Sequence, residues 1–404
     1  MVNVIDGGFF GFGIGFASFS TILPLFVSTM TSSAILIGLI PAVHVVGWQL
    51  PQLFTAHRVA QQKRYKPMTM FYTIQERLPY LGLAIIAWFV PQIGPRIALI
   101  LTFLLLIWQG LGAGFTATAW QSMIGKIIPG DRWGLFFGFQ SAAANLLASV
   151  SAVIAGIVLE RNEPSSGFSM CFLFASGALV LSYIAISLTR EGDVAHVTYS
   201  AERGVFWRNL GQILKRDINF RWFVVVRILA QMGTMGFAFY IVYAVRYYGV
   251  EESTAGILTG VLMIVQTAAN PIMGWLGDRW SHRGVMAVGL IAAALSAVIA
   301  LWAPSVGWFY LVFALAGIAN VAVWTIYMAM TLEFGHEEER PAYIGLVNTL
   351  AAPTAFIIPL FGGWLADSAG YQATFIASSI GAIATVFVLG FILRDQRKIL
   401  AVEE

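Results

Sequence analysis

Charge and cysteine are the two things that this sequence has little of. Of its 404 residues only 11% are charged, whereas 58% are hydrophobic, and a soluble chain of this length needs more charge to cover its surface. The net charge of +3 is too small to indicate a nucleic-acid partner. The single cysteine, Cys171, cannot form a disulfide within the chain. The composition therefore predicts a protein whose natural solvent is a lipid bilayer.

Sequence patterns typical of enzymes are also missing. The chain has no Gly-rich loop with Lys and Ser/Thr to cradle the phosphates of ATP, and its histidines lack the spacing of metal ligands. We therefore expect no enzyme activity, no metal and no cofactor. The first apolar run is too long for a cleaved signal peptide and has no basic flank, so we expect none.

Long apolar runs make up most of the chain. Each can cross ~30 Å of hydrocarbon as a helix, and helices are expected because a lone strand cannot satisfy its backbone in lipid. The twelve predicted spans are 4–28, 33–55, 67–90, 96–122, 134–159, 168–189, 221–245, 253–276, 284–303, 306–332, 342–366 and 370–393. We predict an all-α membrane protein with two six-helix bundles, 1–189 and 221–404, joined by a linker, 190–220.

Basic residues set the expected orientation. If the N-terminus is cytoplasmic, the outer links contain only Arg96, Arg161 and Arg246, and the remaining Lys and Arg outside the spans fall on the inner side. Both termini are then cytoplasmic, and we expect the plasma (inner) membrane. In the linker, apolar residues from Val205 to Leu214 share one side and basic residues the other, which indicates an amphipathic helix on the inner membrane surface. A flexible tether is the alternative.

Traces of an internal repeat relate the two bundles. The span at 33–55 matches 253–276 when Gly38 is placed on Gly260, and the span at 134–159 matches 342–366 when Gly138 is placed on Gly345. Each match is weak, but both agree with the six-plus-six layout. We therefore predict pseudo-symmetric bundles.

The link after the eighth span reads "GWLGDRWSHRG" and resembles the signature found there in the major facilitator superfamily. That signature is Gly-x-Leu-x-Asp-Arg followed by a second basic residue, and the matching residues are Gly274, Leu276, Asp278, Arg279 and Arg283. In that family the glycine lets two helices approach closely, and the aspartate pairs with basic groups and a helix N-terminus. The resemblance implies a twelve-helix transporter with a cytoplasmic gate at Gly274, Asp278, Arg279 and Arg283.

The first half departs from the family pattern in two places. Ala56 stands where the equivalent aspartate would be, so the N-terminal half of the gate lacks its acid. The family's drug–proton antiporters tend to have a Gly-x-Pro-like signature in the fifth helix, whereas Ala152 to Gly156 contains no proline. This weakens the multidrug interpretation without removing it.

Ionisable residues inside the spans are functional candidates because their burial in hydrocarbon costs several kcal/mol. Asp6, His44 and Glu76 are the candidates for proton coupling, and Glu76 with Arg77 can instead form an intramembrane ion network. Structural roles are the alternative for each: a helix cap for Asp6, a satisfied neutral histidine for His44, and an ion network that holds the bundle together for the pair.

Polar and aromatic residues in the spans give the candidates for a substrate cavity. They are Gln109, Arg227, Gln231, Gln266, Asn270, Asn320 and Trp324. Arg227 is the one intramembrane charge of the second half and is suited to an anionic group. Polar residues between packed helices often serve only to hold them together, and that alternative stays open for each amide.

Taken with the resemblance, these residues predict a secondary active transporter. We expect alternating access, proton coupling and a small, amphipathic organic solute, in a monomer that uses no nucleic acid. The alternatives are a multidrug-type efflux antiporter, a facilitative (uncoupled) carrier, and a non-transporting sensor or scaffold with a transporter fold.

Overall fold

The computed structural model describes residues 1–192, 203–249 and 252–397, and within these ranges every regular element is a helix. In chain order they are α1 Val2–Phe16, α2 Ile22–Ser28, α3 Ala34–Gln49, α4 Gln52–Ala60, α5 Lys66–Ile93, α6 Pro95–Ile127, η1 Gly130–Arg132, α7 Trp133–Arg161, α8 Pro164–Ser187, α9 Arg203–Arg216, α10 Ile218–Gly233, η2 Met235–Phe239, α11 Tyr240–Tyr248, α12 Glu252–Arg279, α13 His282–Trp302, α14 Gly307–Val321, η3 Ala322–Ile326, α15 Tyr327–Thr331, α16 Arg340–Ala369, α17 Tyr371–Phe387 and η4 Val388–Ile392.

The predicted all-α membrane fold is confirmed. Each predicted span falls on one helix or on consecutive helices, and ten helical segments of the described chain are long and apolar enough to cross a membrane. The two other predicted spans are the α1–α2 segment, which is interrupted, and α5, which is 28 residues long and contains Glu76 and Arg77.

Several of the helical spans are interrupted or locally distorted. Between α1 and α2 the hydroxyl groups of Ser18 and Ser20 hydrogen-bond each other at 3.1 Å. Serine side chains compete with the backbone hydrogen bonds of a helix, which favours a break here. Pro51 separates α3 from α4. Thr234 ends α10 and leads into the 3-10 turn η2, and η3 is a π-helix inside the tenth span. Irregular backbone of this kind is tolerated at membrane depth where protein covers it.

The chain folds into two compact units that exchange short segments of the two sequence halves. Unit 1 comprises Met1–Ile127, Ala143–Ser200 and Glu337–Ala352, and unit 2 comprises Ile128–Ala142, Ala201–His336 and Pro353–Glu404. The start of α7 therefore belongs to unit 2, and the start of α16 belongs to unit 1. The bundle boundaries predicted at 189 and 221 stay a prediction.

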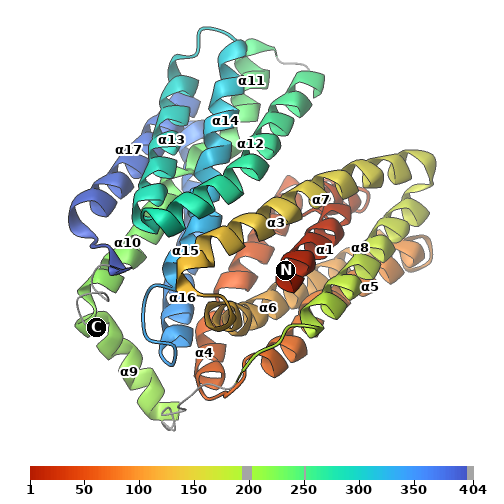
Figure 1. Ribbon diagram of the computed structural model, residues 1–404. Coiled ribbons are helices and arrows are strands. Elements are labelled where there is room, and N and C mark those ends of the chain that lie inside the picture. The colour runs from red at the N-terminus through yellow and green to blue at the C-terminus, as the bar shows by residue number, and fades with distance from the viewer. Residues whose placement is uncertain (193–202, 250–251, 398–404) are drawn as a thin grey trace. The chain divides into compact units, whose positions relative to one another are not determined.

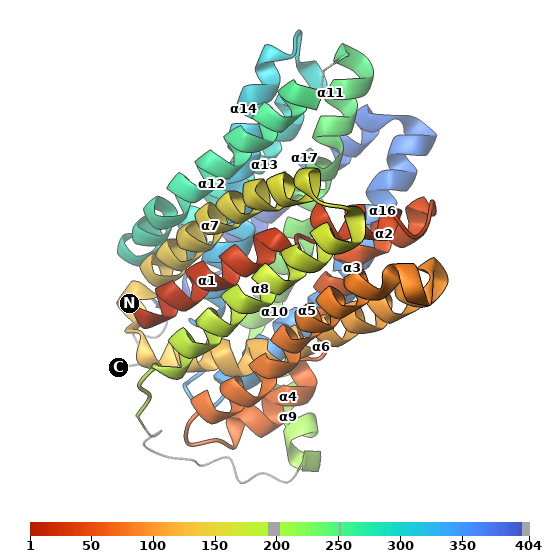
Figure 2. The same cartoon turned by 90° about the vertical axis from the view of Figure 1, so that its right-hand side faces the viewer.

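Each unit has its own apolar core. In unit 1, α1, α5 and α8 lie side by side (Figure 2) around Phe26, Tyr80 and Phe172. In unit 2, α12, α13 and α14 pack together (Figure 1), and the core includes Tyr240 and Phe309. Large apolar side chains remain on the outer surfaces, as a lipid solvent predicts.

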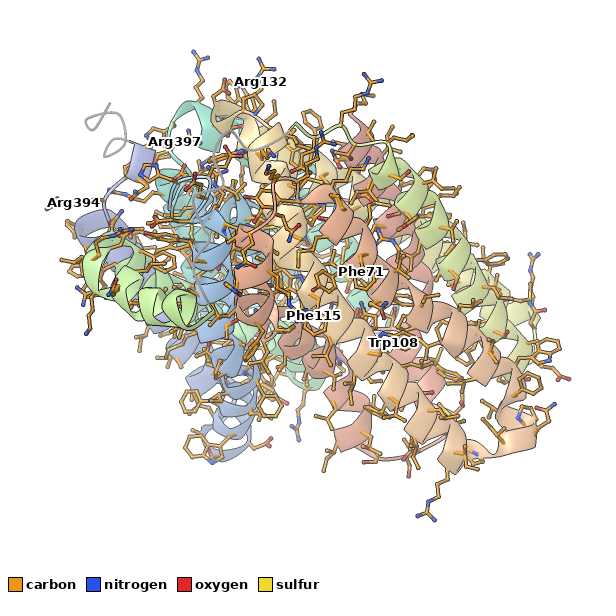
Figure 3. The ribbon with its side chains drawn as sticks, turned by 90° about the horizontal axis from the view of Figure 1, so that it is seen from below. Phe71, Trp108, Phe115, Arg132, Arg394 and Arg397 are labelled. Carbon is orange, nitrogen blue, oxygen red and sulfur yellow. The ribbon has the colours of Figure 1, made fainter. Side chains whose placement is uncertain are left out.

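The outer surface of α5 and α6 illustrates this lipid-facing character. Phe71 is 63% exposed and Trp108 is 41% exposed, and both project from these two helices (Figure 3). Exposed rings of this size on a soluble domain would be a liability, whereas in hydrocarbon they need no cover.

In the described part of the linker, helix α9 covers the predicted amphipathic segment, with Leu210 and Ile213 buried. Residues 193–202 and the side chain of Val205 lie outside the described part. At the start of the linker, the Glu191 carboxylate accepts hydrogen bonds from the backbone N–H groups of Tyr65 and Lys66, at 2.8 and 2.7 Å, and so caps the N-terminus of α5.

Candidate functional site

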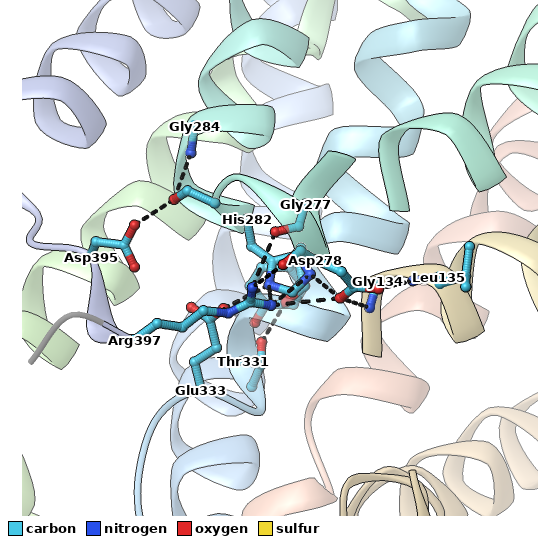
Figure 4. Close-up of polar contacts among 12 residues, drawn as sticks. Gly134, Leu135, Gly277, Asp278, His282, Gly284, Thr331, Glu333, Asp395 and Arg397 are labelled. Carbon is cyan, nitrogen blue, oxygen red and sulfur yellow. Dashed lines mark hydrogen bonds and ion pairs between the residues drawn. The ribbon is translucent and has the colours of Figure 1, made fainter. Parts of the chain in front are cut away.

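The start of α7 rests on α12 through the Asp278 carboxylate. The backbone N–H of Gly134 donates to Oδ1 at 2.8 Å and that of Leu135 donates to Oδ2 at 2.6 Å (Figure 4). Because α7 begins at Trp133, these N–H groups have no partner inside their own helix. They also form the positive end of the helix dipole, which favours a carboxylate. We call this contact of Gly134 and Leu135 with Gly274 and Asp278 the ionic dock.

Glycine is required on both sides of the ionic dock. A Cβ added to Gly134 would collide with the carbonyl oxygen of Gly274 and with the ring of His282, and a Cβ on Gly274 would collide with the carbonyl oxygen of Gly134. The close approach expected of Gly274 is therefore present. The partner helix, which the sequence did not name, is α7.

Three further side chains meet behind Asp278 (Figure 4). His282 Nε2 lies 3.2 Å from Asp278 Oδ1, and Nδ1 lies 2.6 Å from Glu333 Oε1. Arg397 Nε donates to Glu333 Oε1 at 2.7 Å, and Nη1 donates to the carbonyl oxygen of Asp278 at 2.8 Å. The side chain of His282 is 0% exposed. Sequence reasoning missed these three residues, although His282 lies inside the quoted signature.

The two predicted gate arginines lie at the edge of this cluster. The Arg279 guanidinium is 5.8 Å from the centroid of the Trp275 ring. Arg283 Nη1 donates to the carbonyl oxygen of Leu393 at 2.6 Å and so ties α13 to the end of η4. In the described structure, the basic group that pairs with Asp278 from outside its own link is Arg397, at 3.6 Å.

The start of α16 makes the corresponding contact with α4 in unit 1, but with neutral groups. Asn348 Nδ2 donates to Gln52 Oε1 at 2.8 Å, and the backbone N–H of Leu53, in the first turn of α4, donates to Thr349 Oγ1 at 3.2 Å. Gln52 is fully buried and Asn348 is 1% exposed. We call this contact the neutral dock.

The neutral dock corrects the alignment of the internal repeat. A Cβ added to Gly345 would meet Leu53 and Ala56, whereas one added to Gly138 would meet Asn270 and Pro271. With Ala56 placed on Asp278, Gly345 therefore takes the position of Gly134, one helical turn from the predicted match with Gly138. Short glycine-containing repeats fit equally well at several registers, and packing selects one of them.

Arg227 is buried in unit 2 beside the π-helix η3. Its guanidinium lies 3.9 Å from the centroid of the Tyr327 ring and 5.7 Å from that of Trp324, and Nη1 donates to the carbonyl oxygen of Val323 at 2.9 Å. Its Nε has no hydrogen-bond partner in the described structure. The group therefore contacts rings and a carbonyl where a buried cation usually meets a carboxylate.

The predicted cavity residue Asn270 belongs to a polar cluster with Thr325 of η3. Thr325 Oγ1 lies 2.5 Å from Asn270 Oδ1 and 3.1 Å from Ser141 Oγ. Asn270 Nδ2 donates to the carbonyl oxygen of Gln266. π-Turns often occur at functional sites. In η3, Val323 and Trp324 contact Arg227, and Thr325 contacts Asn270. Gln231 lies one turn after Arg227 on α10, and Asn320 is half-buried before η3.

Asp6, Glu76 and Arg77 form one cluster inside unit 1. Arg77 Nη2 lies 3.5 Å from Asp6 Oδ1, and Arg77 Nη1 lies 3.7 Å from Glu76 Oε2. Ser182 Oγ donates to Asp6 Oδ1 at 2.6 Å, and Arg77 also donates to Thr73 Oγ1. The predicted network of Glu76 with Arg77 thus extends to Asp6, which the sequence treated separately.

His44 and Gln109 meet elsewhere in unit 1. His44 Nδ1 lies 2.9 Å from Gln109 Oε1, and the imidazole stacks on Phe19 with ring centroids 3.9 Å apart. Because an amide oxygen only accepts, Nδ1 is the protonated nitrogen in this arrangement. The break between α1 and α2 brings Phe19 to this position.

The fold has close counterparts among solved structures. The structure of a Major Facilitator Superfamily transporter, FucP, in the outward conformation superposes with a TM-score of 0.75 at 14% identity, over 96% of this chain and 98% of that chain. The family model described as Major Facilitator Superfamily matches residues 223–403. Residues 223–403 thus match the superfamily's model, and the chain as a whole has the fold of that superfamily. Both findings agree with the resemblance seen in the sequence.

Curated relatives match parts of this chain. It is 27% identical to monocarboxylate transporter 12 of Rattus norvegicus over 212 residues, which are 50% of this chain and 42% of that protein. It is 31% identical to multidrug resistance protein 2 of Bacillus subtilis (strain 168) over 153 residues, which are 38% of this chain and 37% of that protein. The matches thus span less than half the length of each relative.

Proposed function

We propose that this protein is a secondary active transporter of a small, amphipathic organic anion, and that Arg227 binds the anionic group. The observation that carries the proposal is the environment of Arg227. A buried cation without a carboxylate partner is costly, and an anionic ligand would remove that cost. The rings of Tyr327 and Trp324 beside it suit an apolar ligand body.

Similarity to a monocarboxylate transporter supports the anionic class. Similarity to a multidrug resistance protein supports an apolar body and keeps efflux as the second candidate. The missing proline at Ala152 to Gly156 counts against the second candidate. Gln231 lies one turn from Arg227 on α10, and the Trp324 ring lies 5.7 Å from the Arg227 guanidinium, so both can contribute to specificity.

Proton coupling is assigned to the acidic cluster of unit 1. Asp6 and Glu76 share the single cation of Arg77, so full ionisation would leave one unbalanced negative charge in a low-dielectric interior. A proton on one of the carboxyl groups balances the cluster. Each proton that enters down ~100 mV supplies about 2.3 kcal/mol. His44, whose Nδ1 is held by Gln109, is the second candidate for the proton.

The two docks provide the moving contacts of alternating access. Each joins the start of one long helix to a helix from the other sequence half, and a carrier that opens to the cytoplasm has to separate such contacts. The excess of basic residues in the inner links supports cytoplasmic docks, cytoplasmic termini and the plasma (inner) membrane.

The test of the substrate class compares matched ligands on purified protein. Benzoate, benzyl alcohol and benzylamine share a ring and differ in charge. We expect benzoate to raise Tm more than the other two, and Arg227→Gln to abolish that difference while Arg227→Lys keeps part of it. Arg246→Gln on α11 is the control, because Arg246 is an exposed arginine near Tyr371.

Transport in proteoliposomes completes the test. We expect an inwardly directed proton gradient, acidic outside the vesicles, to drive accumulation of benzoate. Glu76→Gln should stop this accumulation while sparing exchange of labelled for unlabelled benzoate. Equal stabilisation of Arg227→Gln and wild type by benzoate would remove Arg227 from the site. Movement of no anion at all would favour the sensor or scaffold alternative.

A further inference from the structure

We propose that His282 is a proton-binding site that controls the ionic dock. Unlike the acidic cluster of unit 1, this site lies at the contact between α7 and α12 and needs no substrate. The proposal goes beyond the transported solute, because it concerns how proton binding changes the strength of a helix contact.

Each ring nitrogen of His282 faces a carboxylate, and both lie near the Arg397 guanidinium. Nε2 lies 3.2 Å from an acceptor, Asp278 Oδ1, and 3.4 Å from a donor, Arg397 Nη2. Nδ1 lies 2.6 Å from an acceptor, Glu333 Oε1, and 2.7 Å from a donor, Arg397 Nη2. Nδ1 can donate to Glu333 or accept from Arg397, and its proton decides which of the two bonds forms.

The imidazolium satisfies both carboxylates at once, through Nε2–H to Asp278 and Nδ1–H to Glu333. The neutral ring with its proton on Nε2 keeps the bond to Asp278, loses the bond to Glu333 and accepts from Arg397. Addition of one proton at Nδ1 therefore breaks one hydrogen bond and forms another, without a change of backbone. No other chemistry is required.

The charges around the ring favour the proton while the dock is closed. Three charged groups face His282: Asp278 from α12, Glu333 from the segment after α15, and Arg397 from the segment after η4. From α7 the ring faces Gly134, which has no charge. With a neutral ring these groups carry one excess negative charge, and with the imidazolium they are balanced.

Separation of α7 from α12 would remove this advantage. The side chains of His282, Asp278 and Glu333 are 0%, 8% and 3% exposed in the closed dock, and water entering between the helices would screen their attraction. A proton that binds the closed dock better than the open one must, by linkage, favour closure. Acid pH on this side therefore strengthens the dock, and alkaline pH weakens it.

Arg397 makes the C-terminal segment part of the same site. It donates to Glu333 Oε1 and to the carbonyl oxygen of Asp278 whichever form His282 takes. Its bond to Nδ1 is available only to the neutral ring. Arg397 thus partly replaces the proton when the ring is neutral, which limits how far the dock loosens.

The experiment measures the dock directly by the distance between two spin labels. Arg132→Cys and Trp280→Cys place exposed labels on either side of it, in a Cys171→Ser background in nanodiscs. Distance distributions from double electron–electron resonance are compared at about pH 5.5 and about pH 8, which bracket the titration of a histidine. No substrate is added, so failure of the anion proposal does not affect the result.

We expect the ratio of short to long distances to be about fivefold or more higher at acid pH, the lower end of typical allosteric coupling. His282→Gln should abolish this pH dependence, and His282→Arg should hold the short distance at both pH values. His336→Gln, which changes an exposed histidine of the same unit, should behave like the parent protein.

Two results overturn the proposal. One is a parent protein whose distances do not change with pH, and the other is a His282→Gln variant that keeps the full pH dependence. If His282→Gln fails to insert, His282→Arg decides alone: distances that are independent of pH support the site, and retained pH dependence removes it.

Discussion

The ionic dock of unit 2 and the neutral dock of unit 1 join equivalent helices by different chemistry. Helix α7 begins one residue before Gly134, so the N–H groups that face Asp278 are free to bind a carboxylate. Helix α16 begins at Arg340, a full turn before Gly345, so the amides that face Ala56 already bond within their own helix. A carboxylate at position 278 can therefore accept hydrogen bonds from the start of α7, whereas one at position 56 would face no free N–H group of α16.

The largest loss of stability is expected when the neutral dock is given the carboxylate of the ionic dock. Ala56→Asp places a carboxylate at a fully buried position without donors, and an unpaired buried charge costs about 3–5 kcal/mol. We expect a large fall in Tm at neutral pH, measured by thermal unfolding in detergent. The loss should shrink as pH falls, because protonation neutralises the new group, and Ala56→Asn should show no such recovery. A stable Ala56→Asp protein would show that α16 offers donors after all.

Asp278→Asn should weaken the ionic dock next most strongly. The amide keeps one acceptor oxygen but loses the charge, and a hydrogen bond to a charged group contributes about 1.5–3 kcal/mol. We expect a shift toward long distances between labels at 132 and 280, together with impaired transport, in a protein that still folds and inserts. Asp131→Asn, whose side chain is 74% exposed, is the matched control. Parental distances and turnover in Asp278→Asn would remove the gating role.

Gly134→Ala tests the steric side of the same dock. The added methyl group meets backbone and the His282 ring, and overpacking of this kind costs about 1–3 kcal/mol. We expect the labels to separate more often than in the parent. Gly156→Ala, on the same helix, adds a methyl group where nothing lies within 4 Å and should change nothing. Equal behaviour of the two variants would contradict the close approach.

The smallest effect is expected at the neutral dock. Asn348→Ala removes the hydrogen bond to Gln52, which is worth about 0.5–1.5 kcal/mol between neutral groups. Tm should fall slightly and without pH dependence. A double-mutant cycle with Gln52→Ala isolates the pair, and a coupling energy near zero would mean that the two amides contribute independently.

Sequence reasoning and structure agree wherever the relevant signal is local. Asp278 and Gly274 lie within one short signature, and the structure places both in the same contact with the start of α7. The breaks at Ser18–Ser20 and Thr234 escaped because hydropathy averages over them. Glu333 and Arg397 escaped because they are far along the chain from His282, and only folding brings them to it.

By itself, the sequence determined that the chain dissolves in lipid, that it forms helices of spanning length and that it resembles the major facilitator superfamily. These properties follow from composition and from patterns within one or two helical turns. Only the tertiary structure decided which helix N-terminus Asp278 caps, that Asp6 joins Arg77, and that Arg227 meets rings rather than a carboxylate. The reason is physical: hydropathy belongs to each residue and its neighbours, whereas a buried charge is defined by whatever partner the packing of distant helices places beside it.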